Sequence, residues 1–175
     1  VAIELAAERR VELTSVGRGG AKSRDVLANQ VGQANALGAD LALLSVGAND
    51  VLRLTPLQRF EAEMIEICAR LVPNVGTVVI LGVGDLGTIP RLPRDVAWWV
   101  SRRARRANSI ARSMEDRFDT VASCDPWTTM TGFRTRDPRL WVGDRFHASA
   151  AGHEIFYKGA LPVVRKALAS VESPH

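Results

Sequence analysis

The stretch Leu41-Ala42-Leu43-Leu44-Ser45-Val46, followed directly by Gly47-Ala48-Asn49-Asp50, decides the fold class. The first six residues form an apolar run of strand length, which is typical of a strand buried on both faces of a parallel sheet. Glycine then ends the run, and Asn49 and Asp50 stand where the ligand-binding loops of such sheets begin. The flanking sequence should therefore supply further strands in alternation with helices.

Strands and helices do alternate outward from this run. Further strands are expected at 11–16, 78–81 and 120–124, the last being the weakest. Apolar residues recur at helical spacing in the segments 1–9, 23–31, 56–71, 95–118 and 149–168. The residues expected to cap the last four segments are Ser23, Thr55 (followed by Pro56), Asp95 and Ser149. The alternation predicts an α/β fold in which helices cover both faces of a parallel sheet.

Composition is that of an ordinary globular protein. Hydrophobic residues make up 46% and charged residues 24% of 175 positions, so we expect one domain, 1–175, with a sizeable core. Apolar runs such as 75–83 fall short of the roughly 20 residues that a membrane span requires. A net charge of +4 does not by itself indicate a nucleic-acid partner. The two cysteines, Cys68 and Cys124, are expected to be buried free thiols, and no metal-ligand clustering is present.

The loop Gly17–Lys22 follows the first expected strand and precedes a helix, which is where a phosphate-binding loop would lie. It matches neither a P-loop nor a dinucleotide fingerprint, because Lys22 follows alanine and the earlier glycine spacing is absent. A tight turn that requires glycine dihedrals is one interpretation, and a glycine N–H that approaches a ligand is another. A non-catalytic module that binds a small anionic ligand at Gly17–Lys22 is therefore one candidate function.

Two further loops carry side chains suited to chemistry. Asn49 is a neutral donor that can hydrogen-bond an oxyanion, although asparagine after a strand is also a common turn residue. Asp144 and His147 stand just before the last expected helix. In one interpretation Asp144 fixes the tautomer of His147, which takes the proton of a hydroxyl nucleophile. In the other they are a turn carboxylate and a surface histidine.

The helix expected at 95–118 carries a basic run, Arg102, Arg103, Arg105 and Arg106. Because an apolar stripe alternates with this run, we interpret it as a solvated helix face in preference to a nucleic-acid or lipid patch. Trp98 and Trp99, at the start of the helix, either pack against the core, line the crevice or touch a membrane surface.

Three of these segments, in this order, resemble conserved blocks of the SGNH (GDSL-type) hydrolases. They are the glycine loop, Gly47-Ala48-Asn49-Asp50, and the stretch DRFHASAAGH at 144–153, which is similar to the family's Asp-x-x-His-Pro-Ser-x-x-Gly-Tyr. Ala148 replaces the usual proline, and His153 replaces the usual aromatic residue. The resemblance covers residues 11 to about 168. It implies a three-layer α/β/α sandwich with a parallel sheet, of the flavodoxin-like SGNH type.

The resemblance also implies hydrolysis of carboxylic esters through an acyl-enzyme. Gly20 and Asn49 match the oxyanion-hole residues, His147 matches the general base, and Asp144 matches its carboxylate partner. No metal or organic cofactor is implied. The implied partner is a small-molecule or lipid ester and not a nucleic acid, with contact to a membrane surface as a weaker option. A secreted or cell-envelope location would suit many family members.

The sequence departs from the family at its first block, a Gly-Asp-Ser segment that ends the first strand. Neither Gly-Asp-Ser nor Gly-x-Ser-x-Gly occurs. Ser15, Ser23 and Ser45 stand at a strand end, a helix cap and a strand interior. We hypothesise that the chain is N-terminally incomplete, with the first strand and the nucleophilic serine upstream. An upstream segment would then complete the site, and the isolated chain should be inactive and weakly stable.

Overall fold

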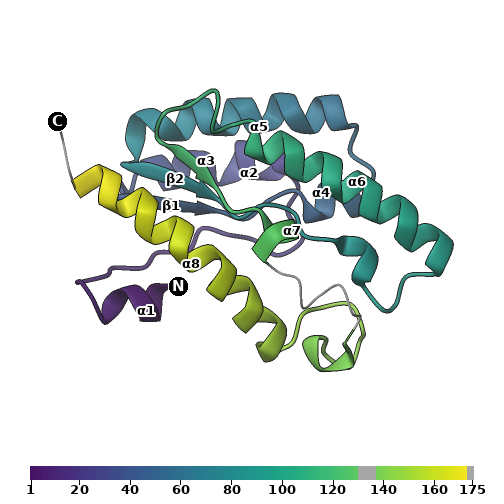
Figure 1. Ribbon diagram of the computed structural model, residues 1–175. Coiled ribbons are helices and arrows are strands. Elements are labelled where there is room, and N and C mark those ends of the chain that lie inside the picture. The colour runs from purple at the N-terminus through teal and green to yellow at the C-terminus, as the bar shows by residue number, and fades with distance from the viewer. Residues whose placement is uncertain (130–136, 173–175) are drawn as a thin grey trace.

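A three-stranded parallel sheet forms the centre of the computed structural model, which describes residues 1–129 and 137–172 (Figure 1). The strands lie in the order β1 (Leu41–Leu44), β2 (Thr77–Ile80) and β3 (Val121–Ser123). All four residues of β2 are buried, as predicted for a strand covered on both faces. The apolar runs at 41–46, 78–81 and 120–124 therefore predicted the three strands to within a few residues.

Helices cover both faces of the sheet, which confirms the predicted α/β class and its three layers (Figure 1). One layer contains α2 (Ser23–Asn29), α3 (Val31–Asn35), α4 (Ala48–Leu52), α5 (Leu57–Leu71) and α6 (Arg94–Arg112). The other contains α1 (Ala2–Ala6) and α8 (Ala150–Glu172). The connections include α7 (Pro126–Thr129) and the short 3-10 helices η1 (Val72–Asn74), η2 (Leu86–Thr88) and η4 (Pro138–Leu140). Among the described residues, no helix combines the length and the apolar composition needed to cross a membrane.

Each face of the sheet has its own hydrophobic core. Val78 and Ile80 pack into the cluster that contains the fully buried Phe60 and Met64 of α5. Val79, between them on the strand, belongs instead to the cluster formed with α8 and α1. Successive side chains of a strand point to opposite faces, so one central strand supplies both cores. The two cysteines are buried free thiols, as predicted.

The strand predicted at 11–16 is wrong, because these residues form no regular structure. A strand needs a neighbour to pair its backbone N–H and C=O groups, and no described strand lies beside this segment. Leu13 is 71% exposed, so the segment also buries little apolar surface. β1 consequently has an open outer edge in the described sheet, and Leu43 on it is exposed, so the expectation that the run at 41–46 is buried on both faces is wrong.

The open edge of β1 leads to a prediction about stability. We expect the isolated 175-residue chain to unfold with a free energy below about 5 kcal/mol, the lower end of the usual range for native domains. The physical reason is that the outer edge of β1 and residues 11–16 exchange no hydrogen bonds with another strand. Chemical denaturation measures this quantity. A cooperative transition that extrapolates to roughly 10 kcal/mol would contradict the prediction.

The caps predicted at Thr55 and Asp95 are wrong by a residue or two. Pro56 and Pro93 occupy the N-cap positions of α5 and α6, and neither helix has a side-chain cap. Asp95 lies within the first turn of α6 instead. Ser149 does cap α8 as predicted, since its hydroxyl accepts a hydrogen bond from a backbone N–H of the first turn at 3.2 Å.

Candidate active site

Asp144 and His147 form a hydrogen-bonded pair just before α8. Nδ1 of His147 lies 2.6 Å from Oδ2 of Asp144. The other carboxylate oxygen, Oδ1, accepts hydrogen bonds from the backbone N–H groups of Phe146 (2.9 Å) and His147 (3.0 Å). The His147 side chain, followed by these two N–H groups, lowers the pKa of Asp144 to about 2. The carboxylate is therefore ionised at neutral pH and can stabilise a positively charged imidazole.

The local backbone accounts for this pairing. Trp141 and Ala148 form an antiparallel bridge, so the chain reverses direction between them. Arg145, in the turn, adopts a left-handed conformation with φ of +57°. The His147 side chain is 73% exposed, so Nε2, on the far side of the ring from Asp144, is open to solvent. An imidazole held in this way presents Nε2 as a proton acceptor.

Gly20, in the loop before α2, and Asn49, in the first turn of α4, lie on two segments that the structure brings together. Nδ2 of Asn49 donates a hydrogen bond to the carbonyl oxygen of Ala21 at 3.1 Å. A primary amide has two N–H bonds, so one of them remains for another acceptor. Gly20 adopts φ of +78°, a conformation that favours glycine, and its N–H donates no hydrogen bond within the described residues. Two neutral donors are thus available on neighbouring segments, the Gly20 loop and the first turn of α4.

Gly47 determines how Asn49 leaves the sheet. It follows β1 with φ of +108°, and α4 begins at the next residue. A Cβ atom at this position would lie 2.7 Å from Cγ2 of Val83 and 3.0 Å from Cζ of Phe60. Only glycine combines this backbone conformation with so close an approach, so the turn that carries Asn49 is fixed by the core beneath it.

A buried network that the sequence did not predict holds the glycine loop in place. Asp50, only 2% exposed, accepts hydrogen bonds from the backbone N–H of Ser23 at 3.0 Å and from its hydroxyl at 2.7 Å. The Ser23 hydroxyl also lies 2.5 Å from Oε2 of Glu63 on α5. The sequence predicts a helix cap at Ser23, whereas Lys22 is the N-cap and Ser23 instead joins α2 to α4. These contacts fix the loop containing Gly20 beside Asn49.

Replacement of Asp50 by alanine should destabilise the protein by about 1–3 kcal/mol, since it leaves the buried N–H and hydroxyl of Ser23 without this acceptor. Chemical denaturation of the variant beside wild type measures the difference. The matched control is Asp40→Ala, which removes an exposed carboxylate and should change stability by less than about 0.5 kcal/mol. Equal stability of the two variants would show that the Asp50 network contributes nothing.

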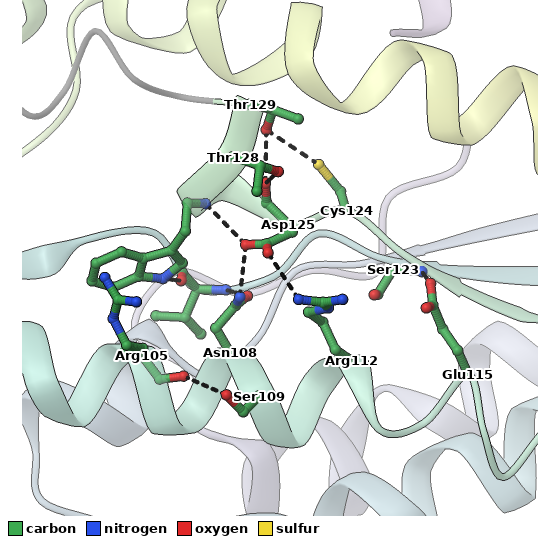
Figure 2. A network of polar contacts seen from close by, with 12 residues as sticks. Arg105, Asn108, Ser109, Arg112, Glu115, Ser123, Cys124, Asp125, Thr128 and Thr129 are labelled. Carbon is green, nitrogen blue, oxygen red and sulfur yellow. Dashed lines mark hydrogen bonds and ion pairs between the residues drawn. The ribbon is translucent and has the colours of Figure 1, made fainter.

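A second network ties the loops after β2 and β3 to α6 (Figure 2). Asp125 accepts hydrogen bonds from Nδ2 of Asn108 (2.9 Å), from the backbone N–H of Trp127 (3.0 Å) and from Nη1 of Arg112 (3.2 Å). Oδ1 of Asn108 accepts from the backbone N–H of Val83 at 3.2 Å, and the Trp127 indole N–H donates to the Val83 carbonyl at 2.9 Å. In Figure 2, Asn108 and Arg112 project from one helix toward Asp125. One helix therefore holds both loops.

The structure thus brings the predicted residues together as two pairs: Asp144 contacts His147, and Asn49 contacts Ala21, the residue that follows Gly20. No hydrogen bond among the described residues joins one pair directly to the other. The loop after β2 does reach the histidine segment, because the Arg91 N–H donates to the carbonyl oxygen of Arg145 at 3.2 Å. Asn49 follows the carboxyl end of β1, and the segment with Asp144 and His147 comes after β3, so these residues follow the edge of the sheet where ligands bind in parallel α/β folds.

A surface depression of about 250 Å³ adjoins the glycine loop. It is lined by residues 18–21 with Asp25, Asn29 and Gln30. Its lining includes one arginine and one carboxylate, so its charge does not select an anion. In the part of the chain that the structure describes, no group of three or more His, Cys, Asp or Glu side chains is placed to hold a metal ion.

Comparison with known proteins gives a family and a set of similar folds. Residues 2–155 match the model of the GDSL-like lipase/acylhydrolase family, and no curated protein matches the sequence. Similar solved structures include LAE5, described as an alpha/beta hydrolase enzyme from the metagenome of Lake Arreo, Spain. It has a TM-score of 0.74 and 21% identity, with 98% of this chain and 78% of that chain covered.

A member of the lipolytic protein G-D-S-L family from Veillonella parvula has a TM-score of 0.67 and 18% identity, with coverage of 92% of this chain and 85% of that chain. Axe2, an acetylxylan esterase from Geobacillus stearothermophilus, has a TM-score of 0.58 and 20% identity, with coverage of 83% and 68%. At these identities the structures show a shared fold. The family match spans most of the sequence, and it confirms the resemblance seen in the three sequence segments: the chain belongs to the GDSL-like lipase/acylhydrolase family.

Proposed function

We propose that this protein hydrolyses carboxylic esters through an acyl-enzyme, with His147 as general base and Asp144 as its orienting carboxylate. The observation that carries the proposal is the 2.6 Å contact between Nδ1 of His147 and Oδ2 of Asp144, with Nε2 open to solvent. Membership of a lipase/acylhydrolase family supports the reaction class. The esterase activity named for Axe2 agrees with it.

The proposed reaction follows from these positions. Nε2 of His147 takes the proton of a serine hydroxyl as its oxygen attacks the ester carbonyl, and the charged Asp144 stabilises the resulting imidazolium. The Gly20 N–H and the free N–H of Asn49 would donate to the oxyanion of the tetrahedral intermediate. The imidazolium then protonates the leaving alcohol, and water attacks the acyl-enzyme by the reverse sequence of proton transfers.

We further propose that the nucleophilic serine lies outside these 175 residues. The candidate serines are differently placed: Ser23 is buried against Asp50, and Ser15 lies in the irregular segment. No serine among the described residues is hydrogen-bonded to the His147 ring. The protein that carries the proposed upstream serine is called the parent protein below.

Hydrolysis of p-nitrophenyl acetate tests the proposal. The parent protein should turn over the ester, whereas the isolated 175-residue chain should show no turnover above that of its own His147→Ala variant. Turnover by the isolated chain that His147→Ala abolishes would place the nucleophile within these residues. A parent protein without esterase activity would refute the proposal as a whole.

A second candidate function is a non-catalytic module that binds a small anion at Gly17–Lys22. The depression beside this loop gives room for a small ligand, and the Gly20 N–H, which donates no hydrogen bond within the described residues, is a donor that an anion could accept from. Inorganic phosphate at a hundred times its dissociation constant would then stabilise the protein by about 2.7 kcal/mol, measurable as a rise in melting temperature. Stabilisation by phosphate in a protein that does not hydrolyse p-nitrophenyl acetate would favour this function over the esterase.

The titration of Asp144 supplies another prediction. His147→Ala should raise the pKa of Asp144 from about 2 part of the way toward its ordinary 3.8, since the backbone N–H bonds remain. Because the pKa is lowered on folding, this contribution to stability is present above pH 3.8 and is lost as the pH falls through about 2. Carbon-13 NMR of the carboxyl group measures the titration, with His153→Ala as the control. A wild-type Asp144 that already titrates near 3.8 would contradict the prediction.

A further inference from the structure

The outward face of α6 combines aromatic and basic side chains. Small residues such as Ala97, Ala104 and Ala107 are buried on the side of the helix that packs on the core. The opposite side presents what we call the Trp–Arg face: Trp98, Trp99, Arg102 and Arg106. Trp98 is 63% exposed and Trp99 44% exposed, so neither packs into the core. Large exposed indoles are unusual enough on a soluble surface to indicate an interaction.

Arginines lie directly against these indoles. The Arg102 guanidinium lies over the Trp98 ring at 4.9 Å from its centroid, and Arg103 lies over Trp99 at 5.7 Å. Such cation–π contacts keep a positive charge beside each exposed ring. The face therefore offers apolar surface and positive charge at the same places.

A hollow of about 90 Å³ lies between three of these arginines. Leu57, Trp99, Arg102, Arg103 and Arg106 line it. A hollow of this volume has room for one phosphate-sized group. Arg103 is held there by hydrogen bonds from its guanidinium to the backbone carbonyl oxygens of Val51 and Thr55. One guanidinium is thus fixed at the hollow and two more line it, and guanidinium groups are suited to bind a phosphate.

The residues around the Trp–Arg face are mostly basic, and exposed apolar side chains lie at its edge. Along its 19 residues α6 has six arginines and a single acidic residue, Asp95. Leu54, next to the Thr55 carbonyl that Arg103 contacts, is exposed, and so is Val96 at the start of the helix. Charge alone would suit any polyanion, but exposed Leu, Val and Trp side chains in addition favour a partner with an apolar interior beneath its phosphates.

We propose that the Trp–Arg face binds the surface of an anionic phospholipid bilayer. Trp98 and Trp99 lie at the level of the headgroups, where indole rings are enriched, and the hollow takes the phosphate of one headgroup. Arg102 and Arg106 add the attraction of basic residues to an anionic leaflet. Because the Arg91 N–H, in the loop before α6, donates to the Arg145 carbonyl, the histidine segment lies next to the start of this helix. Binding does not require catalysis and can be tested separately from it.

Co-sedimentation with vesicles tests the proposal. The protein should bind vesicles of equal parts phosphatidylcholine and phosphatidylglycerol, and should not bind phosphatidylcholine alone. Arg102→Gln with Arg106→Gln should weaken binding roughly 25-fold, about fivefold for each arginine near an anionic surface. Trp98→Ala with Trp99→Ala should weaken it about tenfold through lost apolar contact. The control is Arg10→Gln with Arg70→Gln, which removes the same charge from exposed positions elsewhere and should have a much smaller effect.

Four outcomes would overturn the proposal. They are equal binding to both vesicle types, equal losses in the control and the Arg102/Arg106 variant, displacement from vesicles by millimolar inorganic phosphate, and failure to bind vesicles while a single-stranded oligonucleotide binds through the same arginines. The third would mean a free-phosphate site, and the fourth would mean a nucleic-acid surface. Circular dichroism of each variant should show that the fold is kept, since all of the changed residues are exposed.

Discussion

Replacement of His147 by alanine should lower the kcat of the parent protein for p-nitrophenyl acetate by about 10⁴-fold, the upper end of what a general base contributes. The upper end is expected because His147 is the group that Asp144 orients, so the variant loses the base and leaves the carboxylate without its function. The KM should change little, since the exposed imidazole ring contributes little to ground-state binding.

The matched control for this variant is His153→Ala, which removes an exposed histidine on α8 and should leave kcat within about twofold. The melting temperature should be close to wild type in both variants, because both side chains are exposed. A His147→Ala protein that keeps a tenth or more of the wild-type kcat would mean that another group serves as the base. The assignment of Asp144 as its partner would then be lost as well.

Asn49→Ala should lower kcat by about 10²–10³-fold, the effect of losing one oxyanion donor, again with little change in KM. Asn49→Asp should reduce it further, because a carboxylate of nearly the same shape would repel the oxyanion. The loss of the bond to the Ala21 carbonyl adds a stability effect of about 1 kcal/mol, which has to be separated from the loss of catalysis.

Asn74→Ala provides that separation. Its side-chain amide also donates to a backbone carbonyl, that of Arg70 at 3.0 Å, so it removes a bond of the same kind outside the proposed site. Its kcat should match wild type. If Asn49→Ala and Asn74→Ala have the same kcat, the Asn49 amide serves only to bind the Ala21 carbonyl, and the oxyanion hole must be sought among other donors.

Local patterns predicted most of the fold. The apolar runs around 41–46 and 78–81 predicted strands, and β2 is buried throughout, whereas β1 lies at the edge of the sheet and exposes Leu43. Residues 11–16 show the limit of that inference. Their composition is rich in β-forming residues but their burial is low, and a strand is stable only against a partner, which a one-dimensional pattern does not supply.

In the candidate site, too, contacts between residues close in sequence could be predicted and contacts between distant residues could not. Asp144 and His147 are three residues apart, so their pairing could be predicted from the sequence. The contact between Ser23 and Asp50 joins residues 27 apart, and that between Asn108 and Asp125 joins residues 17 apart on different elements. Neither contact can be predicted from the local spacing of residue types. The exposure of Trp98 and Trp99 could not be predicted either. Helical periodicity predicts which face of a helix carries an indole ring, but it does not predict which other residues cover that face.

The open edge of β1 has a further consequence for how the protein could be assembled. A row of unpaired backbone N–H and C=O groups accepts an added strand from any chain of suitable sequence, covalently attached or not. The residues described here and a separate peptide containing a Gly-Asp-Ser strand could therefore reconstitute one sheet by complementation in trans. At high protein concentration and without such a peptide, the same edge would favour association between copies of the chain.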